Sequence, residues 1–348
     1  MVAGCYIYQQ LDMQWDKVNL EEVISSHQLT NVQLLCFRLI VTSIIGYTIT
    51  NMLTDKKGLH LRLVNPKDEL LNVHLIGIQR FSPFTCWCWS LQMLYFTLTS
   101  LLGLMKQFEI IESSNESQLL KYTIRLIWSA YEVSFSMAFL VTSVVTFGLI
   151  PVAINRKLPF ENFFKVWPLL MHNFNILFIT IELFFNKLPI IIQHNILCFT
   201  WGMLYTFFSM YWYKSKGYFY YFFIDYTKPY APIWLLVLIG IYSVFFTLGA
   251  QFDKFFINGI TFGYPTLLMI CFVLYIMKWP FSEATWRVFI IDLYEVFPKT
   301  LLNGIGIQNP NDSGNSSKNS SSGDQPIKQS DGTPVRRSTR NTPSKNGK

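Results

Sequence analysis

Residues 163–185 read FFKVWPLLMHNFNILFITIELFF and are apolar enough to cross a membrane, yet they include three polar side chains that stand out. These are His172, Asn175 and Glu182, at spacings of three and seven residues. A helix with about 3.6 residues per turn places all three within one narrow stripe. Polar groups at membrane depth are costly, so a helix that keeps them on one face hides that face from lipid. The stripe is therefore a candidate functional site.

The composition of the whole chain is that of an integral membrane protein. Of its 348 residues, 51% are hydrophobic and only 14% are charged. Apolar runs close to the roughly 20 residues that span a bilayer predict seven transmembrane helices and an all-α fold. They cover residues 34–53, 84–105, 127–150, 164–185, 189–212, 232–250 and 256–277.

The distribution of basic residues predicts the orientation of these spans. If the spans alternate in direction, the loops on one side carry six Lys and Arg residues and those on the other carry eleven, leaving out the C-terminal region. An excess of Lys and Arg marks the cytoplasmic side. We therefore predict that the N-terminus is outside or lumenal and the C-terminus cytoplasmic, in the plasma membrane or an endomembrane. The glycosylation sequon Asn115-Glu116-Ser117 falls on the predicted outer side, in agreement.

Four segments follow from these patterns. Residues 1–33 form an extracytoplasmic N-terminal segment and residues 34–278 form the bundle of transmembrane helices. Within residues 279–307, apolar side chains between 282 and 297 recur on one side, which predicts an amphipathic helix lying in the membrane interface. Residues 308–348 are rich in Ser, Asn, Gly and Lys and have almost nothing to bury, which predicts a disordered cytoplasmic tail.

A second polar stripe lies in the predicted span 84–105. Thr85, Gln92 and Thr99 recur every seven residues and so share one face of a helix. By the predicted topology, Thr85 and His172 lie in the same half of the membrane, where they could face each other as a hydroxyl nucleophile and an imidazole base. The same side chains could instead be hydrogen-bonding contacts that hold helices together.

Glu132 is a further buried acid, in the predicted span 127–150. It could pair with His172 or with Arg38, and the sequence does not choose between them. A carboxylate beside His172 would hold the tautomer of the imidazole and make it a better base.

The sequence offers no pattern of a metal, cofactor or nucleic-acid site. Cys86 and Cys88 point to different sides of a helix, and no further Cys or His cluster accompanies them. There is no phosphate loop and no nucleic-acid module, so no cofactor is expected. The net charge of +7 comes mostly from the predicted cytoplasmic loops and tail. Membrane lipids are therefore the expected partners, rather than nucleic acid, and protein partners stay open.

Several motifs resemble the rolling-stone family and the related androgen-induced family of multi-pass membrane proteins. The resemblance covers residues 80–249. Thr85-x-Trp87-x-Trp89 is similar to the rolling-stone pattern Thr-Asn-Trp-Asn-Trp, with Cys at both Asn positions. The fourth span resembles that of the same group in its His-x-x-Asn pattern and in the acid ten residues after the His. Residues 221–229 resemble a Tyr-Pro-x-x-Asp-Trp element, with the Pro replaced.

The resemblance implies two alternative functions. In the androgen-induced branch, a Thr nucleophile and a His hydrolyse fatty-acid esters of hydroxy fatty acids, and the matching positions here are Thr85 and His172. That branch has a second His where this chain has Leu169. The Trp and His-x-x-Asn features agree better with rolling-stone proteins, which are linked to development and cell fusion without an established chemistry. The chain thus resembles either an intramembrane hydrolase of lipid esters or a non-enzymatic protein of adhesion, fusion or signalling.

Overall fold

The structure is a computed structural model that describes residues 13–67, 69–111, 117–257, 263–297, 299–304 and 307. The chain divides into two compact units, residues 1–298 and 299–348. In the second unit the structure describes the short helix α13 (Lys299–Gly304) and residue 307. The first twelve residues, the sequon residues Asn115 and Glu116 and the predicted tail lie outside the described residues.

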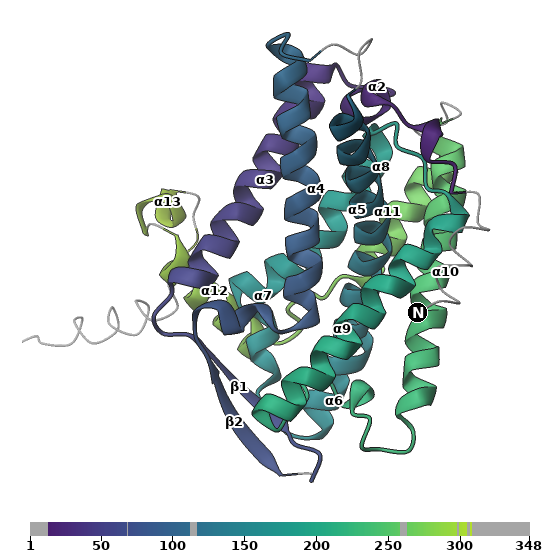
Figure 1. The fold of residues 1–348 in the computed structure, drawn as a ribbon. Coiled ribbons are helices and arrows are strands. Elements are labelled where there is room, and N and C mark those ends of the chain that lie inside the picture. The colour runs from purple at the N-terminus through teal and green to yellow at the C-terminus, as the bar shows by residue number, and fades with distance from the viewer. Residues whose placement is uncertain are drawn as a thin grey trace, which may run out of the picture. The chain divides into compact units, whose positions relative to one another are not determined.

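The described part of the first unit is mostly helical (Figure 1). Its α-helices are α2 (Leu20–Ile24), α3 (Asn31–Thr54), α4 (Phe84–Gln107), α5 (Gln118–Ser143), α6 (Ile150–Asn155), α7 (Val166–Leu169), α8 (Asn175–Phe185), α9 (Asn195–Lys216), α10 (Ala231–Ile257), α11 (Tyr264–Ile276) and α12 (Glu283–Val296). Two π-helical turns, Val144–Leu149 and Leu170–Phe174, join α5 to α6 and α7 to α8. The short 3₁₀ helices are η1 (Trp15–Lys17), η2 (Gly77–Phe81), η4 (Phe160–Phe164), η6 (Ile192–His194) and η7 (Phe222–Ile224).

Five helices in the described residues are long and apolar enough to cross a membrane. They are α3, α4, the continuous helix through α5 and α6, the one through α7 and α8, and α10. The other two predicted spans are also helices, but they differ in kind. α9 has 22 residues and is less apolar, because Tyr, Trp and Thr side chains are frequent in it. α11 has only 13 residues, about 20 Å at 1.5 Å per residue, which is less than the roughly 30 Å of a hydrocarbon core.

The loop between α3 and α4 holds a β-hairpin, so the expectation of an all-α chain was wrong for this segment. Strands β1 (Leu59–Val64) and β2 (Leu70–Leu75) pair antiparallel, with Leu59 opposite Leu75. Apolar side chains from both strands pack against Trp212 and Tyr218 at the end of α9. The period-two alternation in Leu-His-Leu-Arg-Leu-Val is typical of a strand, but six residues are too few to affect a hydropathy window as long as a span.

Successive long helices run in alternate directions, so their connections gather at two ends. At one end, residue Ser26 before α3 forms a β-bridge with Asn186 after α8. At the other end, Ser82 before α4 hydrogen-bonds to Tyr220 after α9 at 2.5 Å. Figure 1 shows α2 near the first end and the hairpin and α6 near the second. This is the alternation that the predicted topology requires, while its orientation stays a prediction.

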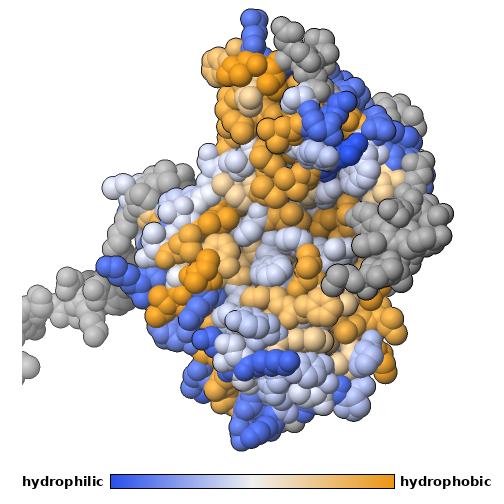
Figure 2. Space-filling model, in the orientation of Figure 1, coloured by the Kyte–Doolittle hydropathy of each residue, from blue (hydrophilic) through white to orange (hydrophobic). Residues whose placement is uncertain are grey.

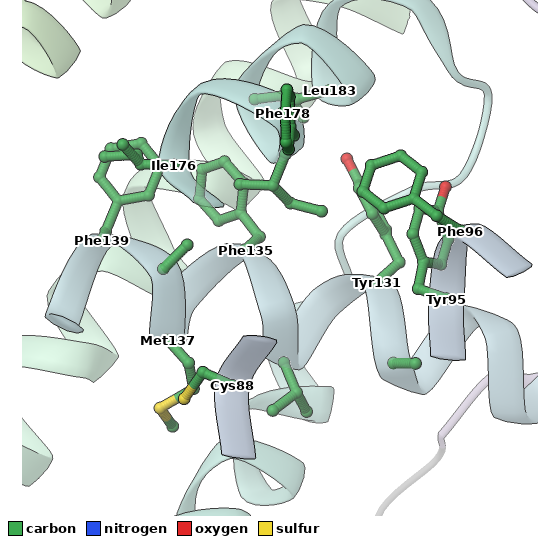
Figure 3. Packing of buried hydrophobic residues seen from close by; sticks show 14 of the residues in the cluster. Cys88, Tyr95, Phe96, Tyr131, Phe135, Met137, Phe139, Ile176, Phe178 and Leu183 are labelled. Carbon is green, nitrogen blue, oxygen red and sulfur yellow. The ribbon is translucent and has the colours of Figure 1, made fainter. Parts of the chain in front are cut away.

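Helix α5 is the centre of the core. Every residue from Ala130 to Thr142 is buried, as expected of a helix that is enclosed on all sides. It packs against α4, α8, α9 and α10. In Figure 3, Phe135 and Phe139 of α5 lie near Ile176 and Phe178 of α8.

The outward faces of the long helices expose large apolar side chains. Ile40 on α3 is 60% exposed and Leu236 on α10 is 68% exposed. Figure 2 shows wide apolar areas on one face, with hydrophilic residues gathered mainly toward its two ends. Water would penalise such a surface, whereas lipid does not, so it agrees with a helical membrane protein.

Candidate functional site

Thr85 and His172 lie side by side at the end of the bundle that holds the hairpin. Thr85 is the second residue of α4, and His172 belongs to the π-helical turn between α7 and α8. The Thr85 Oγ1 atom lies 3.4 Å from His172 Nε2. Both residues are buried. The structure thus brings together the two residues that the sequence singles out, and their catalytic role stays a prediction.

The start of α4 presents Thr85 through contacts from two tyrosines. Amide groups in the first turn of a helix have no partner within the helix. The amide of Phe84 donates to the hydroxyl of Tyr221 at 3.1 Å, and the same hydroxyl interacts with the side chain of Thr85. The hydroxyl of Tyr205 donates to the carbonyl of Ser82 at 3.1 Å. These contacts hold the first turn of α4 against α9 and η7.

Asn175 and Gln92 support the turn that carries His172 through hydrogen bonds to backbone groups. The hydroxyl of Thr142 donates to the carbonyl of His172 at 2.5 Å. The amide of Ile176 donates to Asn175 Oδ1 at 2.6 Å, and Gln92 Nε2 donates to the carbonyl of Asn175 at 2.8 Å. Side chains therefore satisfy backbone groups around the π-helical turn, a deviation that is frequent at functional sites.

Lys278, which follows α11 by two positions, completes the site and was missed by sequence reasoning. Its Nζ atom lies 2.6 Å from His172 Nδ1 and donates to the carbonyl of Pro168 at 3.3 Å. Asn173 holds its backbone, accepting from the Lys278 amide at 3.1 Å and donating to its carbonyl at 2.6 Å. A basic residue at the end of an apolar run normally indicates a membrane-interface anchor, so the sequence carried no signal for this contact.

Glu132 pairs with neither of the partners that the sequence left open. Its Oε2 atom lies 2.5 Å from His194 Nδ1, and its Oε1 atom accepts from the amide of Ile191 at 2.7 Å. His194 Nε2 in turn lies 2.6 Å from the carbonyl of Met13. Glu132 therefore ties the N-terminal segment to the bundle and takes no part in the Thr85 site.

Glu182 also has a partner away from His172. Its Oε1 atom lies 2.6 Å from Arg38 Nη2 and accepts from the hydroxyl of Tyr95 at 2.6 Å. Both ends of the ion pair are buried. His172, Asn175 and Glu182 thus make separate contacts along one helix and do not form a single site.

An apolar cavity of about 100 Å³ lies beside Thr85. Its lining comes from α4, α5, the π-helical turn that follows α5, α9, α10 and η7. The polar side chains in its wall are Thr85, Tyr205, Thr206, Tyr221 and Tyr242, and the rest of the lining is apolar apart from Gly202. A mostly apolar lining of this kind suits part of a hydrocarbon chain.

Helix α12 borders the site and confirms the helix expected between residues 282 and 297. Ser282 accepts from the amide of Thr285 and caps its start. Asp292 Oδ2 accepts from the amide of Val166 at 2.7 Å, which supports the first turn of α7. Burial raises the pKa of Asp292, and the hydrogen bond from Val166 opposes that shift. The position of α12 in a membrane interface stays a prediction.

Within the part of the chain that the structure describes, no group of His, Cys, Asp and Glu side chains is arranged to hold a metal ion. No protein-family model, curated protein or solved structure matches this chain. The described residues thus define a class of protein that is mostly helical, has among them five helices long and apolar enough to cross a membrane, and holds a buried hydroxyl–imidazole pair beside an apolar cavity.

Proposed function

We propose that this protein is an integral membrane hydrolase of lipid esters, with Thr85 as the nucleophile and His172 as the general base. The observation that carries the proposal is the 3.4 Å approach of Thr85 Oγ1 to His172 Nε2, at the wall of an apolar cavity. A Thr hydroxyl is a weak nucleophile unless a base takes its proton. The resemblance to the androgen-induced family, in which a Thr and a His share this role, supports the same assignment.

The first half of the reaction transfers the acyl group to Thr85. His172 Nε2 takes the proton of the hydroxyl as Thr85 Oγ1 bonds to the ester carbonyl carbon, whose electron pair moves onto the carbonyl oxygen. Collapse of this tetrahedral intermediate breaks the bond to the alcohol oxygen, which receives the proton from His172. The products are an alcohol and an acyl ester of Thr85.

The second half regenerates the enzyme. A water molecule gives a proton to His172 while its oxygen attacks the acyl carbon. When the intermediate collapses, Thr85 Oγ1 leaves and takes that proton back, and a fatty acid is released. The sum is one ester and one water converted to one acid and one alcohol.

Tyr221 is the group we assign to the negatively charged oxygen of the intermediate. The residue lines the cavity, and its hydroxyl interacts with Thr85 and accepts from the Phe84 amide at 3.1 Å. Because it accepts from the amide, its own proton is available to a substrate oxygen beside Thr85. Donors placed where charge develops are typically a large part of ester-hydrolase catalysis.

The substrate class follows from the lining of the cavity. Apolar side chains from α5, α9 and α10 surround the space next to Thr85, so the acyl part of the ester is a hydrocarbon chain. Fatty-acid esters of hydroxy fatty acids, which the resemblance implies, combine such a chain with a second apolar arm. The bilayer supplies both to a site between membrane helices.

We also propose the finer topology, with α9 and α11 completing seven spans and the N-terminus outside. In this orientation the ends of the helices that carry Thr85, His172 and Lys278 face the cytoplasmic half of the membrane. Water for the second half-reaction then enters from the cytoplasm. Membership of the rolling-stone and androgen-induced group belongs to the same proposal.

The test is labelling of the purified, detergent-solubilised protein with a fluorophosphonate probe, which reacts with activated hydroxyl groups. We expect the wild type to be labelled on Thr85, as located by mass spectrometry, and Thr85→Ala and His172→Ala to lose the label. Thr206→Ala is the matched control, because Thr206 lines the same cavity and its hydroxyl donates to the carbonyl of Gly202. Melting curves establish that each variant is folded.

Two results would contradict the proposal. One is a folded wild type that does not react with the probe, which would favour the non-enzymatic role in adhesion, fusion or signalling. The other is full labelling of Thr85→Ala, which would place the reactive hydroxyl elsewhere.

A further inference from the structure

We propose that Lys278 is a positioning residue that acts as a neutral amine, holding the imidazole proton of His172 on Nδ1 and leaving the lone pair of Nε2 toward Thr85. The inference about the tautomer rests on geometry alone. Its consequence for catalysis rests on the proposed function.

The distance between the two nitrogens allows a single proton between them. Lys278 Nζ and His172 Nδ1 lie 2.6 Å apart. In one arrangement, a lysine ammonium donates to Nδ1, so the proton of a neutral imidazole sits on Nε2 and points at Thr85. In the other, Nδ1–H donates to a lysine amine, and Nε2 can accept the proton of Thr85. Only the second arrangement leaves His172 able to act as a base.

The hydrogen-bond partners of Nζ fit a neutral amine. A neutral amine has one lone pair and two N–H groups, whereas an ammonium has three N–H groups and no lone pair. The contacts of Nζ in the described structure are His172 Nδ1 and the carbonyl of Pro168. An amine uses both, accepting from the first and donating to the second. The second N–H of the amine and the third N–H of an ammonium both lack an acceptor among these groups, so the count of donors does not separate the two forms.

The surroundings of Lys278 are what disfavour a charge. The residue is 2% exposed, and it forms no ion pair with any carboxylate in the described ranges. The rings of Phe163 and Phe164 lie 5.5 and 5.9 Å from Nζ, near the outer limit of about 6 Å for a cation–π contact. They therefore offset little of the cost of burying an unpaired ammonium.

Lys278 thus takes the part that a carboxylate has in the familiar hydrolase triads, where an acceptor at Nδ1 holds the tautomer of the base. The sequence analysis expected an acid for this role, but Glu132 and Glu182 are engaged elsewhere. A neutral acceptor holds the tautomer equally well, although it stabilises the imidazolium less.

The experiment is nitrogen NMR of the full-length protein labelled with ¹⁵N-histidine, with the signals of His172 assigned by their loss in His172→Gln. We expect the wild type to show Nδ1 protonated and Nε2 unprotonated. Lys278→Gln offers a carbonyl oxygen to Nδ1–H and is expected to keep this tautomer. Lys278→Arg can only donate to Nδ1, so it is expected to move the proton to Nε2.

Probe labelling of Thr85 gives the catalytic readout on the same variants. We expect Lys278→Gln to retain labelling, and Lys278→Arg to lose it by a factor on the order of 10²–10⁴. If Lys278 served packing alone, Lys278→Arg would not be labelled less than Lys278→Gln while both proteins remain folded. If Lys278→Arg does not fold, Lys278→Met replaces it, and mixed tautomers of His172 with weaker labelling are expected.

The outcomes separate this inference from the proposed function. Two results would overturn the role of Lys278 even if Thr85 is labelled. One is a wild-type His172 with its proton on Nε2. The other is an unchanged tautomer in the folded Lys278→Arg or Lys278→Met variant. A third result is a tautomer that responds as expected in a protein that does not react with the probe. That result would support the role of Lys278 in holding His172 and would contradict the hydrolase proposal.

Discussion

Arg38 and Glu182 show how this protein carries charge inside an apolar bundle. Arg38 Nε and Nη2 both contact Glu182 Oε1, at 3.1 and 2.6 Å, and Nη1 donates to the carbonyl of Val23 at 2.7 Å. Tyr95 adds a hydrogen bond to the same carboxylate. Removing one partner from such a buried pair leaves the other charge without compensation, which costs more than removing both.

We therefore expect Arg38→Met alone to lower the stability of the protein by about 3–5 kcal/mol. In the double variant Arg38→Met/Glu182→Gln the buried charge is absent and the amide still accepts from Tyr95, so most of this loss is regained. Thermal denaturation in detergent measures both variants. The double variant could instead lose at least as much stability as Arg38→Met alone. In that case the charge left on Glu182 would not be what destabilises the single variant.

At the scale of elements, the contact between α5 and α10 depends on the absence of a side chain at Gly249. A Cβ built at this position would lie 2.8 Å from Phe135 Cδ1 and closer still to Cε1, and 3.1 Å from Ile190 Cδ1. Phe135 is 1% exposed within the core, so its ring has little room to move. Close approach of two helices at a small residue is a common packing device in membrane proteins.

The expected result for Gly249→Ala is a loss of about 1–3 kcal/mol from overpacking. Gly240→Ala on the same helix is the matched control, because a Cβ there meets nothing within 4 Å. The control is expected to be neutral or slightly stabilising, since Ala favours a helix over Gly. The measurement is the melting temperature of each variant. Equal melting temperatures would show that α10 can shift away from α5 without loss of stability.

For the whole molecule, the distribution of basic residues between its two ends predicts the orientation in the membrane. The hairpin lies at one end of the bundle, with the chain between α9 and α10, and the connection after α8 lies at the other. The larger number of Lys and Arg residues lies on the hairpin side. The positive-inside rule therefore predicts that the hairpin lies in the cytoplasm.

Labelling of single cysteines in intact cells tests this orientation. In a variant without native cysteines, we expect Lys187→Cys to react with a membrane-impermeant maleimide from outside. Lys67→Cys in the hairpin turn is expected to react only after the membrane is permeabilised. The reverse pattern would invert the topology and turn the Thr85 end of the bundle toward the outside or the lumen.

The sequence by itself predicted the membrane class and the positions of the long helices, and it singled out Thr85 and His172 as residues that could meet. Hydropathy over span-length windows reports burial in lipid directly, and the period of the helix aligns His172, Asn175 and Glu182 on one face. The β-hairpin was not predicted because its alternation is shorter than such a window. Helix α11 is shorter than the predicted span because the apolar run begins at residue 256, which still belongs to α10, whereas α11 begins at Tyr264.

Only the tertiary structure decided which polar side chains are partners. Glu132 pairs with His194, Glu182 with Arg38 and His172 with Lys278. Each pair joins residues far apart in the chain, and helical periodicity gives the face on which a side chain lies but neither the neighbour of that face nor its depth. A buried charge or imidazole pairs with the group that helix packing brings within hydrogen-bond reach. Helix packing is a property of the whole chain. It therefore decides which of the acids and bases in the sequence become partners.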